Sequence, residues 1–187
     1  HYVALGNAAD APIMVQQSPH LQAYSATGLD APYLAEIADR APNVQYFKIE
    51  GPGSPERIAE LAPLVDRERV TMFGGGGGIT LLDELKAGAS GLIPGVGYNE
   101  YFMEAWAAWE QGQHDEVERI IGTVQPLVSA ISGPGHEFSL HARKYLMQRA
   151  GYIDSAYVRR PTVPVNEAQL AEVGALADEL NLRISQS

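Results

Sequence analysis

The sequence has no cysteine and few basic residues, with 13 lysines and arginines against 23 aspartates and glutamates. The lack of cysteine excludes a disulfide scaffold and thiolate chemistry. The net charge of -10 argues against a nucleic-acid partner, because binding a phosphate backbone requires a basic surface. No apolar run approaches the roughly 20 residues that a bilayer-spanning helix needs, so we expect no membrane partner either.

The N-terminal stretch HYVALGNAADAP also lacks the basic region and the long apolar core of a signal peptide. We therefore expect a soluble, cytoplasmic protein. With 187 residues and a hydrophobic content of 45%, the chain is long enough to bury one sizeable core.

Short apolar runs alternate with helical patterns in the first half of the chain. Asp30 and Ser54 are the expected N-caps of the first two helices. Apolar strands joined by helices are typical of a parallel sheet covered on both faces, so the expected fold class is α/β. The predicted strands span 12–16, 44–49, 69–73 and 90–95, and the predicted helices span 30–41, 54–65 and 79–88.

The pattern changes after Gly97, where the strands stop. We therefore expect a strand–helix region over 1–98 and a helical region over 99–187. Asn166 is a plausible N-cap for the last helix. The helices of this second region are predicted at 98–112, 114–131, 137–151 and 166–182.

Lys48 lies at the end of the predicted strand 44–49. Strand parity places it on one face with Val44 and Tyr46, at the C-terminal end of a parallel strand, where α/β proteins carry their chemistry. Desolvation favours a neutral amine, which can attack a carbonyl carbon and form a Schiff base. The alternative is a lysine that extends to solvent from the strand end.

Three segments of the sequence resemble the class I aldolase superfamily of dihydrodipicolinate synthase and N-acetylneuraminate lyase. They read APIMVQQSP, NVQYFKIEGPGSPERI and RVTMFGGGGGITLLDELKAGASGLIPG, and they follow the order and spacing of the family. The resemblance implies strands five to eight of a (β/α)8 TIM barrel and the family's helical C-terminal extension. We expect such a chain to be a fragment that is inactive alone, because four strands cannot close an eight-stranded barrel.

The resemblance also implies a set of site residues. Lys48 matches the Schiff-base lysine of the family. Gly74, Gly75 and Ile93 fall where a loop glycine and a main-chain group help to hold the keto acid. No cofactor or metal is implied, since the iminium ion itself polarises the substrate. The implied partners are a small 2-keto acid and further copies of the chain in a dimer or tetramer.

Two positions depart from the synthases. Gln16 stands where the family has a catalytic tyrosine, and Leu21 stands near the place of the arginine that binds aspartate semialdehyde. Both differences argue against dihydrodipicolinate synthase activity. The stretches VQQSP and YFKIE together resemble the branch that contains L-2-keto-3-deoxyarabonate dehydratase. Gln16 is either a hydrogen-bonding partner of the substrate or a structural amide. Glu50, two residues after Lys48, either serves as a general base or holds water, or it is a solvated loop acid or a helix cap.

The glycine run 74–78 lacks the flanking residues of a nucleotide-binding loop. We interpret it as a loop without side chains that lets a substrate approach the backbone. The five histidines do not have the spacing of a metal site, since His136 and His141 are five residues apart.

The predicted function is that of a class I, lysine-dependent lyase that acts on a 2-keto acid. Dehydration of a 2-keto-3-deoxy sugar acid is the leading reaction, and aldol cleavage that releases pyruvate is the second. The alternatives are a non-catalytic relative that binds keto acids and dihydrodipicolinate synthase itself. A buried lysine without a role would be a cost in stability, which argues against the non-catalytic relative.

Overall fold

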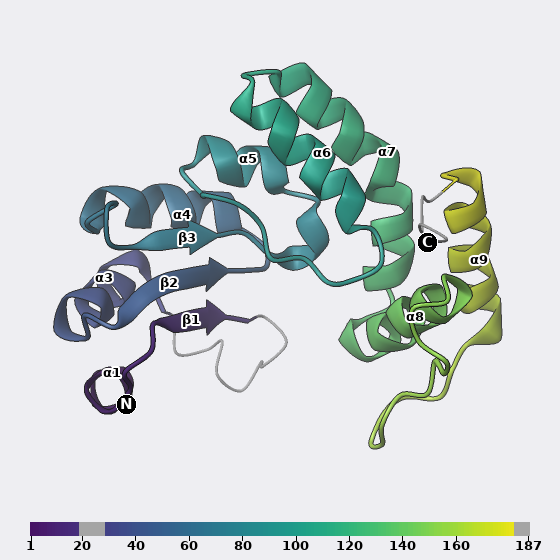
Figure 1. Ribbon diagram of the computed structural model, residues 1–187, viewed down its shortest axis with the longest axis horizontal. Coiled ribbons are helices and arrows are strands. Elements are labelled where there is room, and N and C mark those ends of the chain that lie inside the picture. The colour runs from purple at the N-terminus through teal and green to yellow at the C-terminus, as the bar shows by residue number, and fades with distance from the viewer. Residues whose placement is uncertain (19–28, 182–187) are drawn as a thin grey trace. The chain divides into compact units, whose positions relative to one another are not determined.

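The computed structural model describes residues 1–18 and 29–181 (Figure 1). These residues form two compact units, 1–94 and 95–187, of which the second is described as far as residue 181. The division follows Pro94, four residues before the boundary expected from the sequence.

A three-stranded parallel sheet with the strand order β1-β2-β3 forms the centre of the first unit. In Figure 1 the three arrows run in the same direction, as the βα pattern predicted. The strands are β1 (Ile13–Gln17), β2 (Val44–Ile49) and β3 (Thr71–Phe73). The helices of this unit are α1 (Tyr2–Ala8), α3 (Ala31–Arg40), α4 (Ser54–Leu61) and α5 (Leu81–Lys86), with short 3-10 turns η1 (Ala62–Leu64) and η2 (Gly76–Gly78).

The predicted fourth strand, 90–95, is much shorter than expected. Only a single parallel bridge forms there, between Gly74 and Leu92. Two main-chain hydrogen bonds of 3.0 Å flank it, from Gly74 N to Gly91 O and from Ile93 N to Gly74 O. The segment therefore lies beside the end of β3, but it extends the sheet by one residue pair rather than by a full strand.

The two faces of the sheet differ in burial. Val15, Phe47 and Met72 lie on one face and are at most 2% exposed. Helices α3 and α4 both pack against β2. The sequence predicted a sheet that is covered on both faces. Within the described residues one face is buried as predicted, whereas the other is partly exposed. That second face carries Met14, Gln16, Tyr46, Lys48 and Phe73.

The start of each helix tests the predicted caps. Asp30 caps α3 as predicted, since its Oδ1 accepts a 2.9 Å hydrogen bond from Tyr33 N. The prediction for Ser54 is wrong, because α4 begins after Gly53, whose φ is 77°, and Ser54 makes no cap. The hydroxyl of Ser54 donates instead to the buried carboxyl of Glu84, which lies 30 residues away in the chain. A tertiary contact has replaced the local one.

The second unit is helical as predicted. Its helices are α6 (Asn99–Glu110), α7 (His114–Ser132), α8 (His136–Arg149) and α9 (Glu167–Glu179), and α7 packs against each of the other three. Asn166 caps α9 through a 3.2 Å bond from Gln169 N. The buried side of α7 repeats at helical spacing, with Val117, Ile120, Ile121, Val124, Leu127, Val128 and Ile131.

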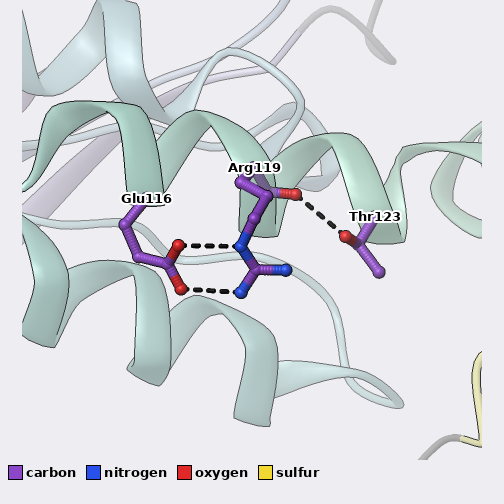
Figure 2. Close-up of polar contacts among 3 residues, drawn as sticks. All are labelled: Glu116, Arg119 and Thr123. Atoms are coloured by element: carbon purple, nitrogen blue, oxygen red, sulfur yellow. Dashed lines mark hydrogen bonds and ion pairs between the residues drawn. The ribbon is translucent and has the colours of Figure 1, made fainter.

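The opposite side of α7 is polar. Figure 2 shows Glu116 accepting two hydrogen bonds from the Arg119 guanidinium, at 2.7 and 2.6 Å, and Thr123 donating to the Arg119 carbonyl at 2.9 Å. The ion pair is exposed, so water screens it and it adds little stability. No helix within the described ranges is long and apolar enough to cross a membrane. A cytoplasmic location stays a prediction.

Candidate active site

Lys48 and Glu50 form an ion pair at the C-terminal end of β2. Their side chains lie on the same side of the extended chain because they are two residues apart. Lys48 Nζ donates to Glu50 Oε1 at 2.9 Å, and the two side chains are 14% and 8% exposed. The alternative in which Glu50 is a solvated loop acid is therefore wrong.

Gln16 joins this pair from the neighbouring strand. It is the register partner of Lys48 across the parallel ladder between β1 and β2. Its Nε2 donates to Glu50 Oε2 at 2.8 Å. The three predicted catalytic residues thus meet around one carboxyl group, with one donor on each oxygen.

The ionised form of Glu50 is favoured by its surroundings. Burial raises the pKa of Glu50, but the hydrogen bonds from Lys48 and Gln16 and the positive charge of Lys48 outweigh it. The main-chain N–H of Gly76 also lowers the pKa of Glu50. The resulting pKa of Glu50 is below the usual glutamate value, so near neutral pH the group is an acceptor of protons.

Arg57 fixes the backbone that carries Glu50. Its Nη2 donates to the Glu50 carbonyl and its Nη1 to the Pro52 carbonyl, both at 2.6 Å. The guanidinium geometry allows one α4 side chain to bind two carbonyls of the loop after β2. Sequence reasoning missed this residue, because an arginine in the first turns of a helix is usually a solvated surface group.

The start of the glycine run 74–78 packs on the Glu50 side chain. A Cβ at Gly75 would overlap Glu50, with Oε1 only 2.6 Å away. Gly74 uses its N–H and C=O in the bridge to residues 91 and 93, and the N–H of Ile93 is bonded to Gly74. The predicted substrate-binding residues Gly74, Gly75 and Ile93 thus lie together, but several of their main-chain donors are already occupied. Their contact with a substrate stays a prediction.

Glu84 of α5 is a second buried carboxyl beside this loop, with 0% exposure. Its Oε1 accepts hydrogen bonds from the hydroxyls of Ser54 and Thr80, the latter at 3.0 Å. A Cβ at Gly74 would overlap its Oε2. Sequence analysis missed this residue, although the buried side of the helix, Leu81, Glu84 and Leu85, has the i, i+3, i+4 spacing of a core face.

The pKa of Glu84 is raised, in contrast to that of Glu50. Burial is the main cause, and the negative charge of Glu50 adds to it. Hydrogen bonds from Ser54 and Thr80 and the amide of Gly75 reduce the effect without reversing it. Two neighbouring carboxyls therefore have opposite tendencies, Glu50 toward the charged form and Glu84 toward the neutral form.

The arrangement offers a nucleophilic amine beside a carboxylate. Lys48 can attack a carbonyl carbon, and Glu50 can accept a proton from the group that is attached. Within the described residues, no three histidine, aspartate or glutamate side chains gather in a group that could hold a metal ion.

Comparison with known proteins supports the resemblance found in the sequence. No protein-family model matches the chain. Over 180 residues the chain is 33% identical to an L-2-keto-3-deoxyarabonate dehydratase of Azospirillum brasilense, which covers 96% of this chain. The chain spans 56% of the length of that relative.

Solved structures share the fold. Dihydrodipicolinate synthase from Aquifex aeolicus superposes with a TM-score of 0.82 and 17% identity, over 100% of this chain and 61% of the synthase. A prophage protein of E. coli K12 from the dihydrodipicolinic acid synthase family, solved in complex with pyruvate, has a TM-score of 0.79 and 19% identity, over 96% of this chain and 59% of its own. The resemblance to the dihydrodipicolinate synthase superfamily is confirmed.

The expected fold, part of a (β/α)8 barrel with a helical region after it, is also confirmed. The barrel fold of these solved structures explains the open face of the sheet, because three strands make only part of the wall of a closed barrel. One expected departure from the superfamily cannot be placed, since Leu21 lies outside the described residues.

Proposed function

We propose that the whole protein is a class I lyase that dehydrates a 2-keto-3-deoxy sugar acid through a Schiff base on Lys48. The observation that carries this proposal is the contact of Lys48 with Glu50 at the end of β2, with Gln16 on the second carboxyl oxygen. The similarity to a dehydratase over 96% of the chain supports the same reaction class.

The first step is formation of the Schiff base. The neutral Nζ of Lys48 attacks the C2 carbonyl carbon of the keto acid, and the carbinolamine loses the former keto oxygen as water. The product is an iminium ion between C2 and Nζ. Glu50 is close enough to Nζ, at 2.9 Å, to accept the proton that the ammonium group must lose before it attacks. Glu50 returns this proton to the carbinolamine hydroxyl, which leaves as water, so Glu50 is ionised again before the second step.

The second step is loss of the substrate hydroxyl. The iminium ion acidifies C3, whose proton passes to Glu50 while the electron pair of the C–H bond forms the enamine. The enamine then expels the C4 hydroxyl, which takes the proton from Glu50 and leaves as water. Hydrolysis of the conjugated iminium consumes one water and returns free Lys48, so the net change is the loss of one water.

Gln16 positions the base in this scheme. An amide cannot titrate as a phenol does, so it cannot take over proton transfer from the tyrosine that the family has at this place. It donates to Glu50 Oε2 instead and leaves the proton-transfer role to the carboxylate.

We further propose that Gly74, Gly75 and Ile93 bound the space that the keto acid enters. The N–H groups of Gly74 and Ile93 are already bonded, so the two glycines contribute their lack of a side chain, and Ile93 contributes its carbonyl oxygen rather than a free donor. No cofactor takes part in the scheme, and a homo-oligomer, a dimer or tetramer, is the proposed assembly.

Borohydride trapping tests the proposal. The whole protein is incubated with pyruvate or with a 2-keto-3-deoxy sugar acid and then reduced, and the adduct is located by peptide mass spectrometry. We expect an adduct on Lys48 that disappears in Lys48→Ala and persists in Lys86→Ala, a control at an exposed lysine of α5. Folded protein without an adduct would refute the Schiff-base mechanism.

The products distinguish the reactions. Loss of water from the sugar acid supports the dehydratase, whereas release of pyruvate identifies an aldolase with the same lysine. Condensation of pyruvate with aspartate semialdehyde would identify a dihydrodipicolinate synthase. Trapping without turnover of any of these substrates would point to the non-catalytic relative that binds keto acids.

A further inference from the structure

Glu84 is a buried acid that the proposed mechanism does not use. It is 0% exposed, and no ion pair within the described part of the chain includes it. An unpaired carboxylate in such a place costs more free energy than a neutral carboxyl group does. Its surroundings are hydroxyl groups, main-chain amides and Glu50, which is the ionisable neighbour that contributes to its electrostatics.

The hydrogen bonds of Glu84 join two loops of the first unit. Ser54 stands at the end of the loop that leaves β2, and Thr80 stands at the end of the loop that leaves β3. Both hydroxyls reach the same oxygen, Oε1. One carboxyl group thus holds together the loop that carries Glu50 and the loop that carries the glycine run.

The glycine run lies between the two carboxyl groups. Glu84 occupies the place that a Cβ of Gly74 would take, and Glu50 occupies the place that a Cβ of Gly75 would take. The main-chain N–H of the next residue, Gly76, lowers the pKa of Glu50. A shift of Glu84 would therefore move the main chain that supplies this donor.

We propose that Glu84 is a positioning residue for the Lys48–Glu50 pair and acts through the main chain of Gly74–Gly76. Its Oε1 accepts from Ser54 and Thr80, while its Oε2 makes no regular hydrogen bond in the described structure and packs on Gly74. The catalytic consequence rests on the proposed function, but the structural consequence does not.

Three variants of the whole protein separate this role from simple filling of the core. Glu84→Gln keeps the shape of the side chain in a permanently neutral form. Glu84→Ala removes the contacts with Ser54, Thr80 and Gly74. Asp83→Asn is the matched control, because it removes a carboxyl from an exposed position of the same helix.

Two measurements are made on each variant. The first is the pH dependence of borohydride trapping with pyruvate, whose acidic limb reports ionisation of Glu50. The second is deuterium exchange of the peptide that spans residues 73–79, which reports the glycine run directly. Exchange needs no substrate, so it tests the positioning role even if wild-type protein gives no adduct and the proposed function fails.

For Glu84→Ala we expect the acidic limb to move to higher pH, because a displaced Gly76 N–H no longer lowers the pKa of Glu50. Exchange of peptide 73–79 should be about tenfold faster, which corresponds to the loss of roughly one hydrogen bond. Glu84→Gln and Asp83→Asn should match wild type in both readouts. Ser54→Ala and Thr80→Val leave the Glu84 side chain in place and should also speed the exchange, a result that loss of core volume at Glu84 does not produce.

The proposal is overturned if folded Glu84→Ala leaves both the acidic limb of the trapping profile and the deuterium exchange of peptide 73–79 unchanged. It is also overturned if Glu84→Gln behaves like Glu84→Ala in both measurements. If Glu84→Ala does not fold, Ser54→Ala and Thr80→Val each remove one hydroxyl from Glu84 Oε1. Unchanged exchange in both would then refute the role.

Discussion

Gln16 lies opposite Lys48 in the parallel register of β1 and β2, and the two side chains donate to different oxygens of Glu50. The carboxylate is therefore held between an amine and an amide from neighbouring strands. A base held in this way cannot rotate without losing a hydrogen bond, so its direction is set before a substrate arrives.

Glu50→Gln should separate Schiff-base formation from proton transfer. An amide preserves the size of the side chain but cannot accept a proton, so we expect turnover to fall by about 10²–10⁴-fold, the usual contribution of a general base. An adduct of a keto acid on Lys48 should still accumulate, but more slowly and without the acidic limb that reports ionisation of Glu50, because solvent must take the ammonium proton in its place. Rate measurement and borohydride trapping on one preparation check this, and unchanged turnover would exclude Glu50 as the base.

Gln16→Leu should change the pH dependence of the reaction. Its hydrogen bond lowers the pKa of Glu50, so its removal lets that pKa rise, and the acidic limb of kcat/KM should move to higher pH. Gln17→Leu is the matched control, because Gln17 is on the same strand but its amide donates to the Leu29 carbonyl. A limb that moves equally in both variants would contradict this account.

Gly74→Ala should destabilise the protein, because the added methyl group overlaps the buried Glu84 carboxyl. Overpacking of this kind costs about 1–3 kcal/mol of unfolding free energy. Thermal or denaturant unfolding measures the loss.

The control for this steric effect is Gly76→Ala. A Cβ at Gly76 has its nearest neighbour at 3.9 Å, so it meets no overlap, although the φ of 59° brings some backbone strain. We expect Gly74→Ala to be the more harmful of the two, and Glu84→Ala to restore part of its loss in the double variant. A double variant as unstable as the sum of the single variants would show that the two positions do not interact.

Glu84→Gln should stabilise the protein increasingly as pH rises. The pKa of Glu84 is raised in the folded state, so the folded protein binds more protons than the unfolded chain between the two values. Wild type therefore loses stability as pH rises from the unfolded pKa through the folded one, whereas the amide does not. Melting temperatures of both proteins from acidic to neutral pH check this, and a constant difference would contradict it.

Glu116→Gln should leave the melting temperature unchanged. The pair with Arg119 on α7 is exposed and screened by water, and the hydrogen bonds lower the pKa of Glu116 without burying the group. Thermal unfolding at low and high salt measures the contribution of the pair. A clear loss of stability at low salt would show that it contributes more than its exposure suggests.

The strand and helix order of the first unit was predictable because its signals are local. The strand 44–49 has the predicted bounds, and Asp30 and Asn166 cap the helices that follow them. The fourth strand was overestimated, since only Leu92 pairs with the end of β3. An apolar run shows the capacity to form a strand, but pairing depends on how the neighbouring backbone lies.

The amino-acid sequence by itself determined which residues could carry the chemistry. Lys48 and Glu50 share a side of β2 through strand parity, which is a property of the extended backbone alone. The tertiary structure decided what those residues contact. The register between β1 and β2 brings Gln16 into contact with Glu50. The packing of α5 places Glu84 against Gly74. It also lets the Ser54 hydroxyl donate to Glu84 instead of capping a helix. Such contacts join residues more than thirty positions apart or depend on how whole elements pack, so no local pattern encodes them.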